Sequence, residues 1–196
     1  MAGNRIGVLA LQGDFEAHAK ALERAGARPV EVRTKDDLAS VDALVIPGGE
    51  STTMLKLLHA ESLFDSLREF GASRPIFGTC AGAILLASEV SHPAQESLGL
   101  MDIAVERNAY GRQLDSRVVM LGAHELAPEI NGGPLEAVFI RAPIVRRVGA
   151  GARVLATYRG DPILVEEGLH MLATFHPELS ADARVHRMFI EKVAGR

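Results

Sequence analysis

Two short segments of the chain carry residues that are typical of nucleophilic catalysis, and the first contains the only cysteine. Cys80 stands in the sequence Gly-Thr-Cys-Ala-Gly, between an apolar run and a segment with helical periodicity. A Gly-x-Cys-x-Gly turn between a strand and a helix favours a nucleophile elbow, which holds the thiol at the carboxyl edge of a sheet. The helix that follows would favour a thiolate, and the N–H of Ala81 would point at an oxyanion beside the sulfur. The alternative is a small buried cysteine without chemistry.

The second segment is Phe-His-Pro-Glu at 175–178, directly after an apolar run. A residue before proline favours extended geometry, and residues two apart in an extended chain face the same side, so we expect Glu178 to reach His176. With Cys80 they would form a triad, in which the imidazole moves the thiol proton and the carboxylate orients the imidazole. The alternative makes the histidine a turn residue and the glutamate a helix cap. We interpret His18 and His186 as surface or packing residues, and expect no metal site.

A glycine-rich loop is the third candidate element. The sequence Pro-Gly-Gly-Glu-Ser-Thr-Thr at 47–53 follows the apolar run at 43–46 and precedes a helical segment. Ligands of doubly wound folds bind at such connections, and adjacent glycines allow a close approach of the backbone. A backbone N–H of Gly48 or Gly49 is therefore a candidate second oxyanion donor. Alternatively, the glycines only make a turn and Ser51 caps the helix.

Two arginines are candidates for binding a substrate carboxylate. Arg107 and Arg141 each follow a predicted strand, and a guanidinium pairs well with a carboxylate. Most arginines are solvated surface groups, which is the alternative for both.

The elements that must position these residues alternate between strands and helices in the first half of the chain. This alternation predicts a single α/β domain over 1–196, with a central mixed, mostly parallel sheet flanked by helices. Strands are expected at 5–11, 29–32, 43–46 and 75–77, and helices at 15–25, 51–59, 63–70 and 81–87. The second half is expected to be mainly β, with strands at 101–105, 118–121, 137–140, 154–157, 163–165 and 171–175 and a last helix at 183–193.

Composition excludes several classes of function. The chain has 196 residues, a formal net charge of -4 and no tryptophan. The absence of a basic stripe argues against nucleic acid and against an anionic membrane surface as partners. No apolar run approaches the roughly 20 residues that span a bilayer. A single cysteine excludes an intrachain disulfide and favours a reducing compartment, so we expect a cytoplasmic protein.

Taken together, the motifs resemble class I (triad) glutamine amidotransferase domains, and most closely the glutaminase subunits of two-component pyridoxal phosphate synthases. The resemblance runs nearly end to end and is most specific in Pro-Gly-Gly-Glu-Ser-Thr-Thr and Ile-Arg-Ala-Pro. Ala10, where glycine is frequent, and the segment 91–96 depart from the pattern. The segments that carry the resemblance are 10–13, 47–53, 77–82, 105–108, 139–143 and 175–178.

The resemblance implies a flavodoxin-like fold and a triad of Cys80, His176 and Glu178. It implies that L-glutamine is hydrolysed to L-glutamate and ammonia without a cofactor. It also implies a hetero-oligomer with a synthase subunit, which condenses the ammonia with a pentose phosphate and a triose phosphate into pyridoxal phosphate (vitamin B6). The implied contacts to glutamine are Gly49, Glu50, Ser51, Arg107, Ile140 and Arg141.

Three other functions compete with this one. A glutaminase that feeds a different synthase would share the triad but not the two specific segments. A binding or regulatory module on the same scaffold would have lost the activity, because a fold does not fix a function. A thiol peptidase or another amide hydrolase would be distinguished by assays on glutamine, asparagine and a peptide.

Overall fold

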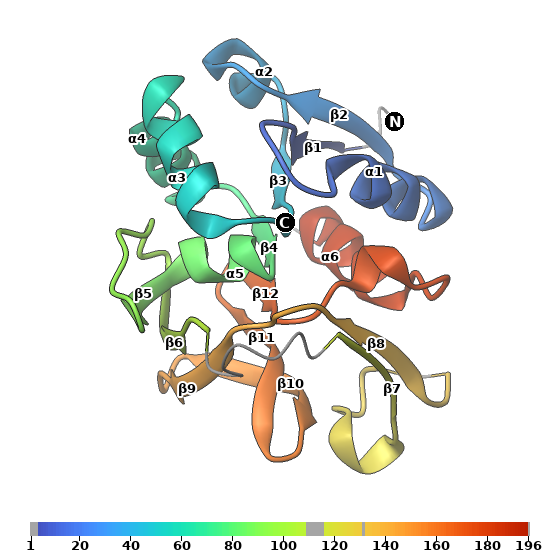
Figure 1. Ribbon diagram of the computed structural model, residues 1–196. Coiled ribbons are helices and arrows are strands. Elements are labelled where there is room, and N and C mark those ends of the chain that lie inside the picture. Colours follow the sequence, from blue (N-terminus) through green and yellow to red (C-terminus); the bar gives the residue numbers. More distant parts are fainter. Residues whose placement is uncertain (1–3, 109–115, 131, 196) are drawn as a thin grey trace.

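A seven-stranded sheet forms the centre of the computed structural model, which describes residues 4–108, 116–130 and 132–195 (Figure 1). The strand order is β10-β11-β12-β4-β3-β1-β2, in which β12 to β2 are parallel and β10 and β11 are antiparallel additions at one edge. The predicted α/β class with a mostly parallel central sheet is confirmed. The strands are β1 Arg5–Leu9, β2 Arg28–Val32, β3 Ala43–Ile46, β4 Ile76–Thr79, β10 Ala152–Tyr158, β11 Asp161–Glu167 and β12 His170–Ala173.

Helices cover both faces of the sheet, so its central strands are apolar throughout. On β3, Leu44 and Ile46 join one hydrophobic cluster, whereas Ala43 and Val45 join the other. This alternation follows from the two-residue period of a strand. In Figure 1, α1 and α6 lie on one side of the central strands and α3, α4 and α5 on the other. Their bounds are α1 Phe15–Arg24, α3 Ser51–Ala60, α4 Phe64–Gly71, α5 Ala81–Leu86 and α6 Arg184–Ala194.

Two smaller sheets lie outside the central one. β5 (Ala87–Ser91), β6 (Met101–Glu106) and β9 (Ile144–Val148) form one, and β7 (Arg117–Leu121) and β8 (Leu135–Phe139) form the other. The sequence prediction missed β5 and β9, because both are partly exposed and mix charged with apolar residues.

The short helix α2 (Lys35–Ala39) was also missed by the sequence prediction. Five residues are too few to show a helical period. Its signal is instead a capping box, in which the Thr34 side chain accepts the N–H of Asp37 and the Asp37 carboxylate accepts the N–H of Thr34.

Two strands of the central sheet end earlier than predicted, and both differences concern its carboxyl edge. β1 ends at Leu9 rather than at residue 11, and β12 ends at Ala173 rather than at residue 175. The segments after them leave the sheet as loops. These loops carry Gln12 and His176 to the edge where β4 also ends, at Thr79.

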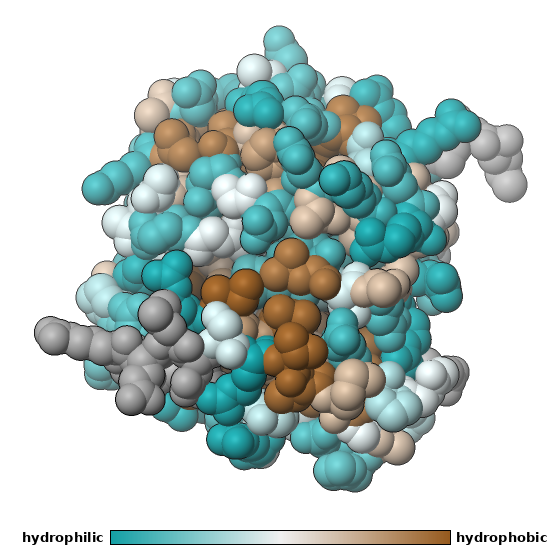
Figure 2. Space-filling model, turned by 45° about the vertical axis from the view of Figure 1, so that its right-hand side comes forward, coloured by the Kyte–Doolittle hydropathy of each residue, from teal (hydrophilic) through white to brown (hydrophobic). Residues whose placement is uncertain are grey.

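The surface carries a small set of exposed hydrophobic side chains. Val118 and Met120 point outward from β7, and Leu179 lies on the 3-10 turn η2 (Pro177–Leu179), which contacts β8. Figure 2 turns this side of the molecule forward and shows hydrophobic side chains gathered in a band there. Within the described residues, none of the helices combines the length and apolar character that a bilayer crossing requires.

Phe189 should be a major contributor to the stability of this fold. Its ring is fully buried on α6 and lies 5.6 Å, between centroids, from the Phe77 ring of β4. We expect Phe189→Ala to lower the free energy of unfolding by about 3–5 kcal/mol, because it leaves a cavity. Met120→Ala, on the exposed face of β7, should change it by less than about 0.5 kcal/mol. Urea unfolding measures both, and equal midpoints for the two variants would contradict this account of the core.

Candidate active site

The cysteine turn is held by close backbone packing. Cys80 joins β4 to α5 with φ 48° and ψ -102°, a conformation that costs energy for a residue with a Cβ. A Cβ at Gly78 would lie 2.5 Å from the carbonyl oxygen of Gly82, and a Cβ at Gly82 would collide with the carbonyl of Ile46. Cys80 N–H donates to the carbonyl of Ala173 on β12 at 2.9 Å. The backbone of a nucleophile elbow is therefore present where the sequence predicted it.

His176 and Glu178 meet as predicted, but through a different backbone. His176 Nδ1 lies 2.7 Å from Glu178 Oε1, and both side chains are buried. The chain does not stay extended after His176, because Pro177–Leu179 form a 3-10 turn. This turn places the Glu178 carboxylate next to the imidazole. The backbone N–H of His176 donates to the carbonyl of Val138 on β8 at 2.8 Å, which fixes the start of the turn.

The histidine, the cysteine and the glycine loop converge around Gly48. A Cβ at this position would lie 2.5 Å from His176 Cε1 and 3.4 Å from Cys80 Cβ, so only glycine fits between the two side chains. The Cys80 thiol directs a weak hydrogen bond to the carbonyl of Ile140 at 3.9 Å. His176 Nε2 is buried and makes no hydrogen bond to a described residue. This nitrogen is therefore available for proton transfer.

The charge state of His176 is set by its neighbours rather than by burial. Burial acts to lower the pKa of His176, but interactions with the Cys80 sulfur and the Glu178 carboxylate outweigh it and raise the pKa from 6.5 to about 10. The imidazolium thus persists through neutral pH and is lost only as the pH rises towards 10.

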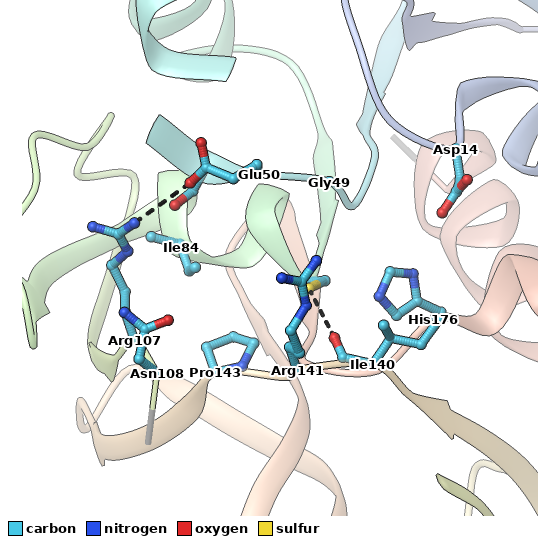
Figure 3. Close-up of a pocket in the computed structure, with 12 residues that line it drawn as sticks. Asp14, Gly49, Glu50, Ile84, Arg107, Asn108, Ile140, Arg141, Pro143 and His176 are labelled. Atoms are coloured by element: carbon cyan, nitrogen blue, oxygen red, sulfur yellow. Dashed lines mark hydrogen bonds and ion pairs between the residues drawn. The ribbon is translucent and has the colours of Figure 1, made fainter. Parts of the chain in front are cut away.

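A cavity of about 210 Å³ opens beside these groups (Figure 3). The structure brings all six predicted glutamine contacts into its wall, together with Cys80 and His176. Of the three predicted oxyanion donors, Gly49 lines the cavity, whereas Gly48 is buried behind it and Ala81 is buried at the start of α5. The sequence analysis did not anticipate four further lining residues, Asp14, Ile84, Asn108 and Pro143.

Charged groups of both signs face the cavity. Glu50 caps α3 by accepting the N–H groups of Thr52 (3.0 Å) and Thr53 (2.7 Å). Burial acts to raise the pKa of Glu50, but these hydrogen bonds prevail and lower it to about 2. Arg107 donates to Thr52 Oγ1 at 2.9 Å and lies 3.7 Å from the Glu50 carboxylate, whereas Arg141 makes no ion pair with any described residue. Figure 3 shows both arginines extending into the cavity.

Two features of the site differ from the expectations. Ser51 is not the cap of α3, since Glu50 takes that place and the Ser51 hydroxyl donates to Gln95 Oε1 at 3.0 Å. Asp14, which the sequence analysis missed, brings a carboxylate oxygen within 4.8 Å of ligand-type atoms of His176 and Glu178. Its signal was its position after the first strand, at the same edge as the glycine loop.

Of the two interpretations of His18 and His186, as surface or as packing residues, the structure supports packing and excludes the surface. His18 and His186 are fully buried, with His18 Nδ1 3.0 Å from His186 Nε2. His18 Nε2 lies 2.9 Å from Thr79 Oγ1 and 3.3 Å from Glu178 Oε2. The sequence did indicate that His18 is buried. It stands four residues before Leu22, so both side chains lie on the same buried face of α1.

Solved structures give the class of protein. A crystal structure described as a glutamine amidotransferase matches with a TM-score of 0.87 at 46% identity, covering 96% of this chain and 98% of that one. The structure of a putative GMP synthase component from Thermoplasma acidophilum matches with a TM-score of 0.71 over 100% and 96% of the two chains. At 16% identity it shares the fold alone. The fold is that of the glutamine amidotransferases.

Comparison of the sequence with protein families identifies the family within this class. A family model described as the SNO glutamine amidotransferase family matches residues 8–195, and the chain belongs to this family. Two relatives, each named pyridoxal 5'-phosphate synthase subunit PdxT, come from Solibacter usitatus and Koribacter versatilis. The first is 60% identical and covers 96% of this chain and 99% of the relative; the second is 51% identical and covers 96% and 95%. The predicted family and the enzyme class are confirmed.

The charge pairing at the thiol can be tested without a substrate. Cys80 is the only cysteine, so alkylation by iodoacetamide reports on this thiol alone. We expect His176→Ala to slow alkylation at pH 7 by roughly tenfold, because a neighbouring imidazolium stabilises the reactive thiolate. His170→Phe, which removes a buried histidine at the other end of β12, is the control and should leave the rate unchanged. A rate that is insensitive to His176 would show that the two groups are not coupled.

Proposed function

We propose that this protein hydrolyses L-glutamine to L-glutamate and ammonia, and passes the ammonia to the synthase subunit of a pyridoxal phosphate synthase in the cytoplasm. The observation that carries the proposal is the convergence of Cys80, His176 and Glu178 beside a cavity with charges of both signs. The names of the relatives support the identity of the partner. The proposed chemistry uses side chains and backbone N–H groups of the protein, together with a water molecule.

In the first half of the reaction, the Cys80 sulfur attacks the amide carbon of glutamine and forms a tetrahedral oxyanion. The backbone N–H groups of Ala81 and of the Gly48–Gly49 loop are the proposed oxyanion donors. His176 then gives its proton to the amide nitrogen, the C–N bond breaks and ammonia leaves. The product of this half-reaction is a thioester on the cysteine.

In the second half, a water molecule replaces ammonia. His176 takes a proton from the water, the resulting hydroxide attacks the thioester carbon, and the C–S bond breaks to release glutamate. Glu178 keeps the proton of the imidazole on Nδ1 throughout, so that Nε2 always faces the reaction.

The cavity favours a free amino acid over a peptide. The α-ammonium of glutamine needs an anion and its α-carboxylate needs a cation, and the wall offers the Glu50 carboxylate and the Arg141 guanidinium. Arg107 is already shared with Glu50, so its proposed role is to orient that carboxylate as well as to bind substrate. A peptide lacks both charges at its scissile residue, which argues against the thiol peptidase alternative.

Glutamine hydrolysis by matched variants tests the proposed triad. With the synthase subunit present, Cys80→Ala should abolish ammonia release, and His176→Ala should be nearly as damaging. Glu178→Gln should be milder, because the orienting carboxylate is often the most dispensable member of a triad. Circular dichroism establishes that each variant is folded. Substantial turnover by folded Cys80→Ala would refute the role of the cysteine, and equal, mild losses in all three would point to a binding module.

The glycine loop offers a means of coupling hydrolysis to the partner. The Gly48 carbonyl lies against the α-carbon of Gly13, where a Cβ would collide with it. The side-chain amide of Gln12 packs on Gly49, and its Oε1 accepts the N–H of Glu50 at 3.3 Å. The first strand-to-helix loop therefore contacts the glycine loop at two points. We propose that docking of the synthase at this edge rotates the Gly48–Gly49 peptide and thereby completes the oxyanion site.

This coupling predicts a slow glutaminase that is accelerated by its partner. A missing oxyanion donor costs about 100-fold or more in rate, which is enough for a gate. Gln12→Ala should weaken stimulation by the synthase more than it changes basal hydrolysis, because it removes the link between the two loops. The measurement is ammonia release from glutamine with and without the synthase. A chain that runs at full rate alone would contradict the gate while leaving the triad intact.

A further inference from the structure

One oxygen of Glu178 has no part in the mechanism described above. Oε1 contacts His176, whereas Oε2 is buried and has no hydrogen bond of good geometry to a described residue. His18 Nε2 lies 3.3 Å from this oxygen. A buried carboxylate is costly unless its oxygens receive hydrogen bonds, so the protonation of His18 decides whether Glu178 is stabilised or repelled.

His18 is neutral and therefore carries a single ring N–H. Burial, followed by the charges of His186 and His176, holds the pKa of His18 well below 6.5. If the proton were on Nδ1, it would point to His186 Nε2, and the lone pair of His18 Nε2 would face the carboxylate. His186 would then carry its own proton on Nδ1, which is buried and has no partner. In this arrangement the His18 lone pair repels the Glu178 carboxylate, and the Nδ1–H donor of His186 has no acceptor.

The opposite tautomer removes both problems. With its proton on Nε2, His18 donates towards Glu178 Oε2 and Thr79 Oγ1, while its Nδ1 accepts the N–H of His186 Nε2 at 3.0 Å. Only an acceptor, His186 Nδ1, is left without a partner. Unpaired buried acceptors are tolerated better than unpaired buried donors. Two independent contacts of His18 thus select the same tautomer.

We propose that His18, held in the Nε2–H tautomer by His186, is a positioning residue that fixes the Glu178 carboxylate and, through it, the His176 imidazole. In this arrangement His186 on α6 donates to His18 on α1, and the Nε2–H of His18 faces the Glu178 carboxylate on the turn η2 at 3.3 Å. Helices α1 and α6 lie side by side over the sheet (Figure 1), so the network ties the triad to the helical layer. The inference rests on the proposed role of Glu178.

Kinetics of two variants separate positioning from packing. His18→Phe keeps a ring against the edge of Phe77 but removes the donor, and should lower kcat about tenfold with little change in KM for glutamine. His18→Gln keeps an N–H donor of similar reach and should retain most of kcat. His170→Phe is the matched control for losing a buried histidine, and should leave kcat unchanged. Equal losses in the Phe and Gln variants would overturn the inference.

A double-mutant comparison tests whether His18 acts through Glu178. In a Glu178→Ala background, His18→Phe should cost less than about twofold further, because the group that it positions is already absent. The same tenfold loss in both backgrounds would mean that His18 acts on the fold, and would overturn the inference. If Glu178→Ala alone left glutamine hydrolysis intact, the proposed triad would fail instead, so the two failures are distinguishable.

The tautomer itself can be observed in the unmodified protein. Nitrogen-15 NMR of the histidine rings distinguishes a protonated from an unprotonated ring nitrogen, and His18→Gln identifies the His18 signals by their loss. We expect a neutral ring with the proton on Nε2. A proton on Nδ1, or a charged ring at neutral pH, would overturn the inference even if His18→Phe failed to fold.

Discussion

Backbone packing at the cysteine turn is the constraint on which the site depends. The α-carbon of Gly82 lies against the Ile46 carbonyl of the neighbouring strand, and the Cys80 N–H is bonded to Ala173 on the other side. The sulfur is thereby fixed relative to both β3 and β12. The loops that leave these two strands carry the Gly48–Gly49 pair and His176, so this turn fixes the sulfur relative to both of these proposed parts of the site. A positive φ at Cys80 is tolerated because the packing on both sides over-determines it.

Buried charge is the second organising feature. His176 and Glu178 are removed from water, which would be unfavourable for each alone. Each offsets the cost for the other, because His176 Nδ1 and Glu178 Oε1 are only 2.7 Å apart. At the wall of the cavity, Glu50 and Arg107 form a more exposed pair in which helix N–H groups stabilise the carboxylate. The proposed reacting groups are thus buried, whereas the Glu50 carboxylate, which is proposed to hold the substrate, is exposed.

The features that depend on a single turn could be predicted from the sequence, whereas those that depend on contacts between elements distant in the chain could not. The elbow at Cys80 could be anticipated because its glycines are a requirement of a single turn. The contact between His176 and Glu178 was anticipated, but the 3-10 turn that makes it was not, since proline is compatible with both geometries. The hydrogen bond between His18 and His186 depends on how α1 and α6 lie on the sheet, which no local pattern specifies. The pairing of Arg107 with Glu50 likewise joins segments that are far apart in the chain.

The strand order has a consequence for biosynthesis of the protein. β12 is formed by residues 170–173, yet it lies in the interior of the sheet, between β11 and β4. A nascent chain that has emerged only through β4 presents a bare sheet edge and a cysteine without its histidine. Closing this edge requires a contact across about ninety residues of sequence, the kind of long-range pairing that forms late in folding. A translation product that stops before β12 lacks His176 and Glu178, and under the proposed mechanism it releases no ammonia.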